Sequence, residues 1–399
     1  MEHLYEQSDA QIRLAAAARP FRRYLFGQIH WQSRLIGILG ARGTGKTTLL
    51  LQYLNETSDG APAGVYLSLD DLYFSAHNLS ETVSELYKSG ARRIALDEVH
   101  KYPRWSQELK MLCDRYPELQ IVFSGSSIID ISRQQHDLSR RAVMYQLHGL
   151  SYREYLELRH NIVIEPQTLT DLLSRGKEIT AGLDPSFRPL QHFGHYLQFG
   201  FYPFFLEEEA TYMIRLNQVV RTIVEYDMAE MEGFDVRNSR KILQLLSLLS
   251  TSVPFRPNIS KLSEKTSISR TTLLSYLHLL EQAQLISMMH AAGKSTSMLQ
   301  KPEKILISNP NLMYMLSRGE PDAGSVRESF ALQQLRVKHQ VSYPAKGDFL
   351  VDDTFTLETG GPGKGRQQLQ GTENGFVVSD RLEYPTANRI PLWMLGLLY

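Results

Sequence analysis

The chain of 399 residues has one cysteine and no net charge, because 43 lysines and arginines balance 43 aspartates and glutamates. A single cysteine excludes an internal disulfide, and with it the disulfide-framed secreted domains. Cys113 lies in a run of helical pattern, so we expect a buried structural thiol in a reducing compartment. A neutral chain has no overall attraction to nucleic acid, so any such attraction must come from a local patch.

Long apolar runs are also missing. No stretch approaches the roughly 18 apolar residues of a membrane-spanning helix, and no signal-peptide pattern is present. The sequence has no internal repeat, no low-complexity tract and no zinc-type Cys/His spacing. Apolar residues make up 42% and charged residues 22%, as in ordinary globular proteins. We therefore expect a cytoplasmic protein of several domains that has no membrane partner.

One glycine-rich stretch matches a phosphate-binding motif. Residues 40–47 fit G-x-x-x-x-G-K-[ST] at every fixed position, after an apolar run and before a helical pattern. Glycines let backbone N–H groups surround a phosphate, and the positive end of the following helix attracts the same anion. We expect Lys46 to reach the β- and γ-phosphates of ATP and Thr47 to bind Mg²⁺. The predicted nucleotide-binding residues are Gly40, Ala41, Arg42, Gly43, Thr44, Gly45, Lys46, Thr47 and Thr48.

A second predicted strand, with the apolar residues 94–96, is followed by two acidic residues. Asp97 and Glu98 follow this predicted strand, and another predicted strand lies between it and the glycine-rich loop. An aspartate at such a strand tip can hold Mg²⁺ through water. Glu98 is placed to polarise the attacking water as a general base. The loop and the acidic pair together predict the site of an ATPase.

A third strand, predicted over 120–127, ends in small hydroxyl residues. Adjacent parallel strands place their carboxyl ends together, at the ligand edge of an open sheet. Ser124 or Ser126 is therefore expected near the γ-phosphate or the attacking water, and we favour Ser124 for this sensing role. The alternative is that these serines, Ser127 above all, cap the following helix.

These motifs together resemble a known family. The loop 40–47, Leu96-Asp97-Glu98-Val99-His100 and Phe123-Ser124-Gly125-Ser126-Ser127 are similar to segments of the AAA-family ATPases of bacteria and archaea that carry a winged helix and a C-terminal nuclease-like domain of unknown function. The segment 147–155 resembles that family's L-x-P-L-S-F-x-E-F, with Gly149 in place of the proline. Gly200-Phe201-Tyr202-Pro203 resembles its G-G-F-P, so the likeness covers nearly the whole chain.

The resemblance implies an arginine after the sensor strand that acts on the γ-phosphate across a subunit boundary. Arg140 and Arg141 are the candidates, and Arg141 matches the family's arginine better. A surface arginine, or one that binds a helix end, is the alternative for both. The resemblance also implies a helical lid, and a homo-oligomer is a candidate assembly.

Residues 240–304 contain nine lysines and arginines against three acidic residues, the clearest basic bias in the chain. Two short helical runs, 259–266 and 270–281, are joined by a tight turn, which matches a helix-turn-helix, and 285–289 is placed to begin a wing. DNA is therefore a candidate partner, and a protein client is the alternative. The candidate recognition residues are Ser269, Arg270, Thr271, Thr272 and Ser275.

The last part of the chain carries a metal-dependent nuclease pattern with one position changed. Asp348 and Glu358 have the spacing of two carboxylates that hold Mg²⁺. The lysine expected two residues after the glutamate is replaced by Gly360, and Lys364 lies nearby in a glycine-rich loop. We therefore expect a degenerate module and keep an active nuclease only as an alternative.

The sequence thus predicts an α/β fold with a parallel P-loop sheet, a helical lid, a winged helix and a small C-terminal α/β nuclease-like domain. The predicted function is Mg²⁺-dependent ATP hydrolysis that drives or gates the C-terminal modules on DNA or protein. The alternatives are a nucleotide-gated switch with little turnover and an ATP-regulated, metal-dependent DNA nuclease. The predicted catalytic residues are Lys46, Glu98, Ser124 and Arg141, and the predicted metal site is Thr47 and Asp97. The predicted domains are a helical segment at 1–33, the ATPase domain at 34–155, the lid at 156–235, the winged helix at 236–310 and the nuclease-like domain at 311–399.

Overall fold

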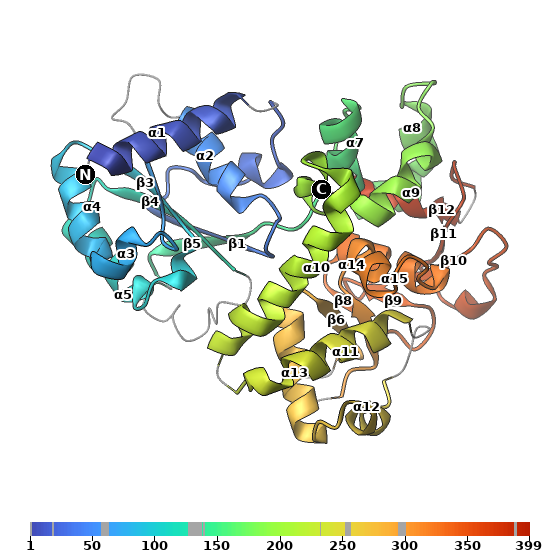
Figure 1. Cartoon of the computed structure of the whole chain (residues 1–399). Helices are drawn as coiled ribbons and strands as arrows, with labels where there is room; N and C mark the ends of the chain where they lie inside the picture. Colours follow the sequence, from blue (N-terminus) through green and yellow to red (C-terminus); the bar gives the residue numbers. More distant parts are fainter. Residues whose placement is uncertain are drawn as a thin grey trace. The chain divides into compact units, whose positions relative to one another are not determined.

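The computed structural model forms two compact units, Met1–His148 and Gly149–Tyr399. Figure 1 labels the elements of both. No described helix is long and apolar enough to cross a membrane. The structure describes residues 2–17, 20–56, 64–126, 138, 140–231, 233–251, 257–293, 301–386 and 389–399.

The first unit is built on a five-stranded sheet of order β2-β3-β4-β1-β5, in which all pairings are parallel. The inner strands are almost wholly buried, as expected for continuous apolar runs that are covered on both faces. The predicted parallel α/β fold is confirmed. The strands are β1 (Leu35–Gly40), β2 (Val65–Ser68), β3 (Arg93–Asp97), β4 (Gln120–Ser126) and β5 (Ala142–Gln146).

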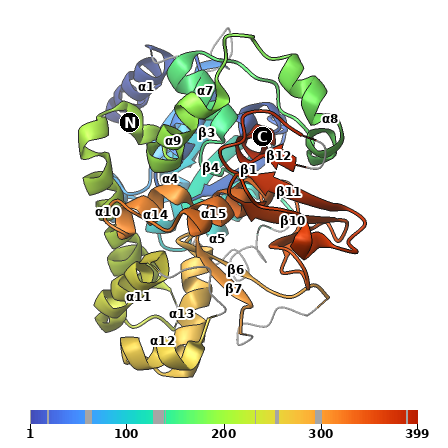
Figure 2. The ribbon, with the colours of Figure 1, turned by 90° about the vertical axis from the view of Figure 1, so that its right-hand side faces the viewer.

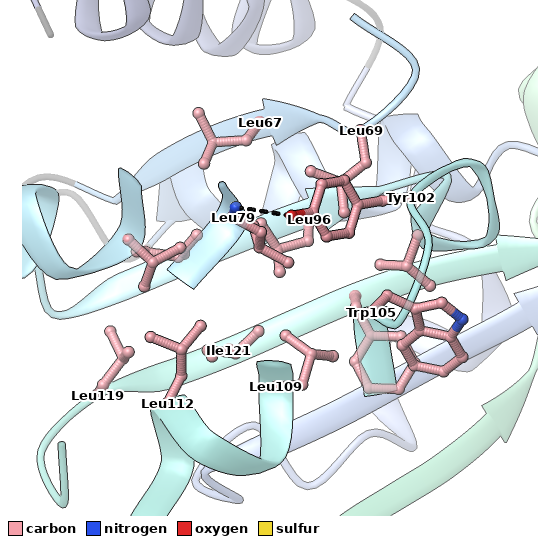
Figure 3. Packing of buried hydrophobic residues seen from close by; sticks show 14 of the residues in the cluster. Leu67, Leu69, Leu79, Leu96, Tyr102, Trp105, Leu109, Leu112, Leu119 and Ile121 are labelled. Atoms are coloured by element: carbon pink, nitrogen blue, oxygen red, sulfur yellow. Dashed lines mark hydrogen bonds between the residues drawn. The ribbon is translucent and has the colours of Figure 1, made fainter. Parts of the chain in front are cut away.

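Helices cover both faces of this sheet (Figure 1). On one face, leucines of α4 and α5 pack with Trp105 against Leu67, Leu96 and Ile121, as Figure 3 shows. On the other face, α2 buries its leucines against β1. Each fully buried leucine contributes about 1.5–3 kcal/mol, so these two layers hold the sheet. The helices are α1 (Glu2–Ala17), α2 (Lys46–Glu56), α3 (Tyr73–Ala76), α4 (Leu79–Lys88) and α5 (Trp105–Arg115).

Two details differ from or complete the sequence expectation. In the segment 1–33, for which the sequence predicts helix with a break at Pro20, α1 ends at Ala17, and the described chain from Pro20 to β1 contains a 3-10 turn, Tyr24–Gly27. A proline that removes a backbone donor and several aromatic side chains that pack on the domain account for this. Cys113 is buried, as predicted, and burial raises the pKa of its thiol.

The second unit begins with helices that join the two later family-like segments. Leu150 N donates to Phe201 O at 2.8 Å, and a Cβ on Gly149 would lie 2.3 Å from the Phe201 ring. The glycine is therefore required for this contact. Ser151 and Glu154 form a capping box that starts α7. The helices are α7 (Tyr152–His160), α8 (Leu169–Ala181), α9 (Pro189–Phe199) and α10 (Tyr212–Thr222), followed by a π-helical turn, Ile223–Asp227.

The predicted winged-helix residues form three helices and an antiparallel hairpin. The turn between the second and third helices passes through Ser267, which has a left-handed φ of 52°. Ser269 then caps the third helix by accepting from Thr272 N. The elements are α11 (Ser239–Thr251), α12 (Ile259–Thr266), α13 (Arg270–Gln282), β6 (Ile286–Met289) and β7 (Lys304–Ile307), and α14 (Pro310–Leu316) follows.

The chain ends in a second five-stranded sheet of order β12-β11-β10-β9-β8, beside α15 (Ala323–Leu335) (Figure 2). The terminal segment Leu392–Leu397 is buried, and Ser151 Oγ donates to Tyr399 O at 2.7 Å. The terminal apolar run thus packs back onto the second unit, as expected. The strands are β8 (Val341–Ser342), β9 (Phe349–Val351), β10 (Phe355–Gly360), β11 (Gly375–Ser379) and β12 (Arg389–Pro391).

Candidate functional site

The register of the first sheet brings the predicted site residues together. Ile38 lies beside Ser124 and Gly40 beside Ser126, while Leu96 pairs with Phe123. The carboxyl ends of β1, β3 and β4 therefore meet at one edge. The glycine-rich loop, the acidic pair and the small hydroxyl residues all leave the sheet there, as the sequence predicts.

The backbone of the loop requires glycine at three positions. Gly43 and Gly45 have φ angles of 83° and 94°, which strain any residue that has a Cβ. A Cβ on Gly40 would lie 2.4 Å from the backbone oxygen of Leu147, which cannot move aside cheaply. The helix α2 begins at Lys46, directly after the loop, so its positive end faces the same region.

Lys46 is buried within its own loop. Its Nζ donates to Gly40 O at 3.0 Å and to Ala41 O at 3.1 Å. Thr44 closes the turn by donating from Oγ1 to Ala41 O at 2.9 Å. Arg42 and Gly45 are half-buried, and Thr48 is exposed on the first turn of α2.

Asp97 collects hydroxyl groups from three elements. Its Oδ2 accepts from Thr47 Oγ1 at 2.6 Å and from Tyr66 OH at 2.9 Å, and Ser124 Oγ donates to Oδ1. Burial, reinforced by the charge of Asp97, raises the pKa of Tyr66, so the phenol stays protonated and donates. A carboxylate and a threonine hydroxyl at this separation are the oxygen ligands that Mg²⁺ prefers, so the residues fit the predicted metal.

Glu98 leaves the sheet in a strained conformation. Its φ of 53° is left-handed, and its N–H is 3.2 Å from Ser124 Oγ. Its Oε2 lies 3.3 Å from Nε2 of His100. Burial, aided by the positive charges of Lys101, Lys46 and Arg42, lowers the pKa of His100 to about 3. The imidazole is therefore neutral at pH 7, so the contact is one between a neutral ring and the side-chain carboxylate.

Arg23 holds the glycine-rich loop in place through hydrogen bonds to backbone carbonyls. This residue is not predicted by the sequence analysis. It is buried, and its guanidinium donates to Thr44 O at 2.5 Å and to His148 O at 2.7 Å. A planar group with several donors can hold two carbonyls at once, which an ammonium cannot do as well. Tyr66 and His100 are also absent from the predicted site residues.

Arg141 does not join this site within one chain. Ala142 pairs with Leu35, so Arg141 lies at the opposite end of β1 from Gly40, about 20 Å away at ~3.3 Å per residue. Its guanidinium forms two bonds of 3.0 Å with the carboxylate of Asp114. Arg140 is exposed beside it. A catalytic role for either arginine would therefore need a neighbouring subunit, and stays a prediction.

The candidate recognition residues lie at the cap and in the first turns of α13. Ser269, Arg270 and Thr271 are exposed at the start of α13, while Thr272 and Ser275 are half-buried. Ser127 lies outside the described residues.

In the last domain, Lys364 Nζ lies 2.5 Å from Glu358 Oε1. Across the described part of the chain, no group of three or more His, Cys, Asp or Glu side chains has the geometry to hold a metal ion.

A glycine loop between a parallel strand and a helix, with its threonine bonded to the aspartate of a second strand, defines the first unit as a P-loop nucleoside triphosphatase. Residues 32–156 match the family described as an AAA domain. This part of the chain is therefore an AAA domain with the P-loop fold. Residues 190–323 match a domain of unknown function, DUF8612.

The uncharacterized protein MJ1637 of Methanocaldococcus jannaschii is 28% identical over 288 residues. That match covers 69% of this chain and 60% of the relative, so it leaves well over a third of the relative unmatched. Among solved structures, AMPPCP-bound DnaA from Aquifex aeolicus is 16% identical and covers 65% of this chain and 84% of its own, with a TM-score of 0.26. C. elegans PCH-2 is 15% identical, covers 69% of this chain and 68% of its own, and also scores 0.26.

Proposed function

We propose that the protein binds and hydrolyses ATP with Mg²⁺, and that hydrolysis drives or gates its C-terminal modules. The observation that carries the proposal is the 2.6 Å hydrogen bond between Thr47 Oγ1 and Asp97 Oδ2. It joins the phosphate loop to the acidic strand end, the two halves that an ATPase site must bring together.

The chain's own residues have separate roles in this proposal. The N–H groups of residues 40–48 surround the phosphates, and Lys46 neutralises the β- and γ-phosphates. Thr47 binds the metal directly and Asp97 holds it through water. Bound Mg²⁺ supplies positive charge to the phosphate oxygens. Because Lys46 already donates to two loop carbonyls at 3.0 and 3.1 Å, it needs only to exchange partners to reach a phosphate.

Glu98 is proposed as the general base, which accepts a proton from the attacking water. Ser124 lies between the two acids, with its hydroxyl on Asp97 and the Glu98 N–H 3.2 Å away. This arrangement supports the predicted sensing role of Ser124, because a movement of its hydroxyl would change its contacts with both Asp97 and Glu98. Arg141 is proposed to act only from a neighbouring subunit.

The module that responds is proposed to be the helical and hairpin part of the second unit. Its exposed Arg270 and Thr271 support DNA as a partner, and a protein client is the alternative. A second candidate function is a nucleotide-gated switch with little turnover. The contact between Glu98 and His100 favours it, because this contact engages the proposed base.

Phosphate release tests the enzyme directly. The wild type is expected to release phosphate steadily, and Glu98→Gln to lower the rate by ~10²–10⁴-fold while a fluorescent ATP analogue still binds. Glu85→Gln, on the exposed face of α4, is the matched control and should keep the full rate. No turnover by the wild type, alone or with DNA, would reject the enzyme and leave the switch.

A further inference from the structure

Five charged side chains lie together in the last part of the chain, of which Lys304, Glu328 and Glu358 are buried and Asp348 and Lys364 are half-buried. The acids are Glu328 of α15, Asp348 before β9 and Glu358 of β10. The cations are Lys304, the first residue of β7, and Lys364 from the loop after β10. The nuclease pattern in the sequence places a divalent metal at Asp348 and Glu358, so the contacts of this cluster test whether such an ion fits.

The lysine that the pattern lacks is supplied from another position. Lys364 Nζ lies 2.5 Å from Glu358 Oε1, although Lys364 follows the glutamate by six residues instead of two. Gly360, which stands at the usual lysine position, makes this possible. A Cβ there would lie 2.4 Å from Cβ and Cγ of Lys364. Gly360 therefore leaves room for the aliphatic part of the Lys364 side chain. The loss of the lysine at position 360 and the presence of one at position 364 are thus linked.

A second lysine lies beside one of the two expected metal ligands, Asp348. Lys304 Nζ lies 2.6 Å from Glu328 Oε2 and 3.7 Å from Asp348 Oδ1, and its side chain is 8% exposed. The other oxygen of Asp348 accepts from Thr359 N and Oγ1, each at 2.8 Å. The buried Glu358 Oε2 has no hydrogen-bond partner in the described structure.

A divalent ion does not fit this arrangement. Thr359 N and Oγ1 donate to Asp348 Oδ2, and Lys364 Nζ lies beside Glu358 Oε1, so the two acids have few oxygens left for a divalent ion. A buried ammonium between two of the acids would also repel a second cation. Burial raises the pKa of Glu328 to about 7, although the nearby ammonium of Lys304 lowers it.

We propose that the ammonium of Lys304 takes the place of the divalent cation in this cluster, so that the last domain binds no metal and cleaves no nucleic acid. The substitute cation is carried by β7 of the predicted winged helix. The cluster therefore ties that hairpin to α15 and β10. Ser329 Oγ of α15 adds a second tie by donating to Ile307 O of β7 at 2.8 Å.

Mn²⁺ binding to the full chain, followed by electron paramagnetic resonance without nucleotide, tests the proposal. The wild type and Asp348→Asn are expected to bind equal amounts of Mn²⁺. Lys304→Met should gain about one bound ion per chain, and Glu358→Gln added to it should abolish the gain. Lys346→Met, an exposed lysine of the same domain, is the matched control and should gain none.

Two results would overturn the proposal. The first is Mn²⁺ binding by the wild type that Asp348→Asn removes, or plasmid cleavage that this substitution abolishes. The second is a folded Lys304→Met, shown by a cooperative melt, that gains no ion. If Lys304→Met does not fold, the comparison of the wild type with Asp348→Asn decides alone, and equal binding with no plasmid cleavage supports the proposal.

Discussion

Nε2 of His100 lies 3.3 Å from Oε2 of Glu98, within the 3-10 turn Val99–Lys101 that follows β3. A neutral imidazole at this distance fixes the direction of a carboxylate without neutralising it. The proposed general base is thus held by a residue from its own turn.

His100→Ala is expected to lower kcat for ATP by ~10- to 100-fold, because the base loses its orientation, while KM stays nearly constant. His100→Gln keeps a donor and should recover part of the rate. In a Glu98→Gln background, His100→Ala should have no further effect on phosphate release. A rise in KM with unchanged kcat would contradict the positioning role.

Arg23→Ala should weaken ATP binding and lower the free energy of unfolding by ~1–3 kcal/mol, since Thr44 O and His148 O lose a buried donor. Arg23→Lys should not restore both bonds. The neighbouring Arg22 forms an exposed pair with Glu56, so Arg22→Ala should cost less than ~1 kcal/mol. Urea unfolding measures the free energy of unfolding, and nucleotide titration measures ATP binding. Equal effects of Arg23→Ala and Arg22→Ala would contradict the role of Arg23 in holding the loop.

Arg141→Ala is expected to bind ATP but to lose turnover, if the arginine acts on a neighbouring subunit. Mixing it with Lys46→Ala, which keeps the arginine, should restore part of the activity. Asp114→Asn breaks the same ion pair and leaves the arginine, so it should stay active. A rate per chain that does not depend on protein concentration, with no recovery on mixing, would exclude action between subunits.

Arg270→Ala should weaken DNA binding about equally for all sequences and reduce the salt slope by about 1, as expected for a lost phosphate contact. Arg221→Ala, an exposed arginine of α10 paired with Glu225, is the control. Fluorescence anisotropy at two salt concentrations measures the effect. No binding by the wild type at low salt would reject DNA as the partner.

Stability should fall in acid because of two stacked histidines in the second unit, His160 and His192, with ring centroids 3.8 Å apart. Burial, the neighbouring histidines and Arg159 lower the pKa of His160 to about 4, and that of His192 is also lowered. The unfolded chain therefore binds more protons below pH ~6.5, and the stability present above that pH is lost as pH falls towards 4.

Replacing both histidines with glutamine should reduce the loss of melting temperature between pH 7 and pH 5. Exposed His30→Gln is the control and should leave the loss unchanged. Glu209, which binds His195 at 2.9 Å, should remain ionised over this range, because its hydrogen bond to His195 lowers its pKa. An undiminished loss in the double variant would contradict the assignment.

The sheet and the centre of the site could be predicted because their signals are local. Apolar runs followed by glycines, acids or serines identify strands and their carboxyl ends, and parallel pairing then brings these ends together. Arg23 and Tyr66 carry no such signal. Tyr66 lies 31 residues from Asp97, and Arg23 binds carbonyls 21 and 125 residues away.

The last domain shows the limit of reading spacing alone. By spacing alone, the lysine expected two residues after Glu358 is missing. A loop can nevertheless bring a lysine from further along the chain to the same carboxylate. Lys304 could not be linked to the cluster from the sequence, because it belongs to a hairpin predicted as part of another domain.

The polarity of the first sheet limits how copies of this chain could cooperate. The phosphate loop follows the carboxyl end of β1, and Arg141 lies near the amino end of the same strand. An arginine that completes a neighbour's site must therefore come from a surface different from the one that receives it, which favours a head-to-tail contact. Such contacts are not self-complementary: they either close into a ring or continue as a filament. In a ring every site would gain an arginine, whereas in an open row the subunit at one end would lack it.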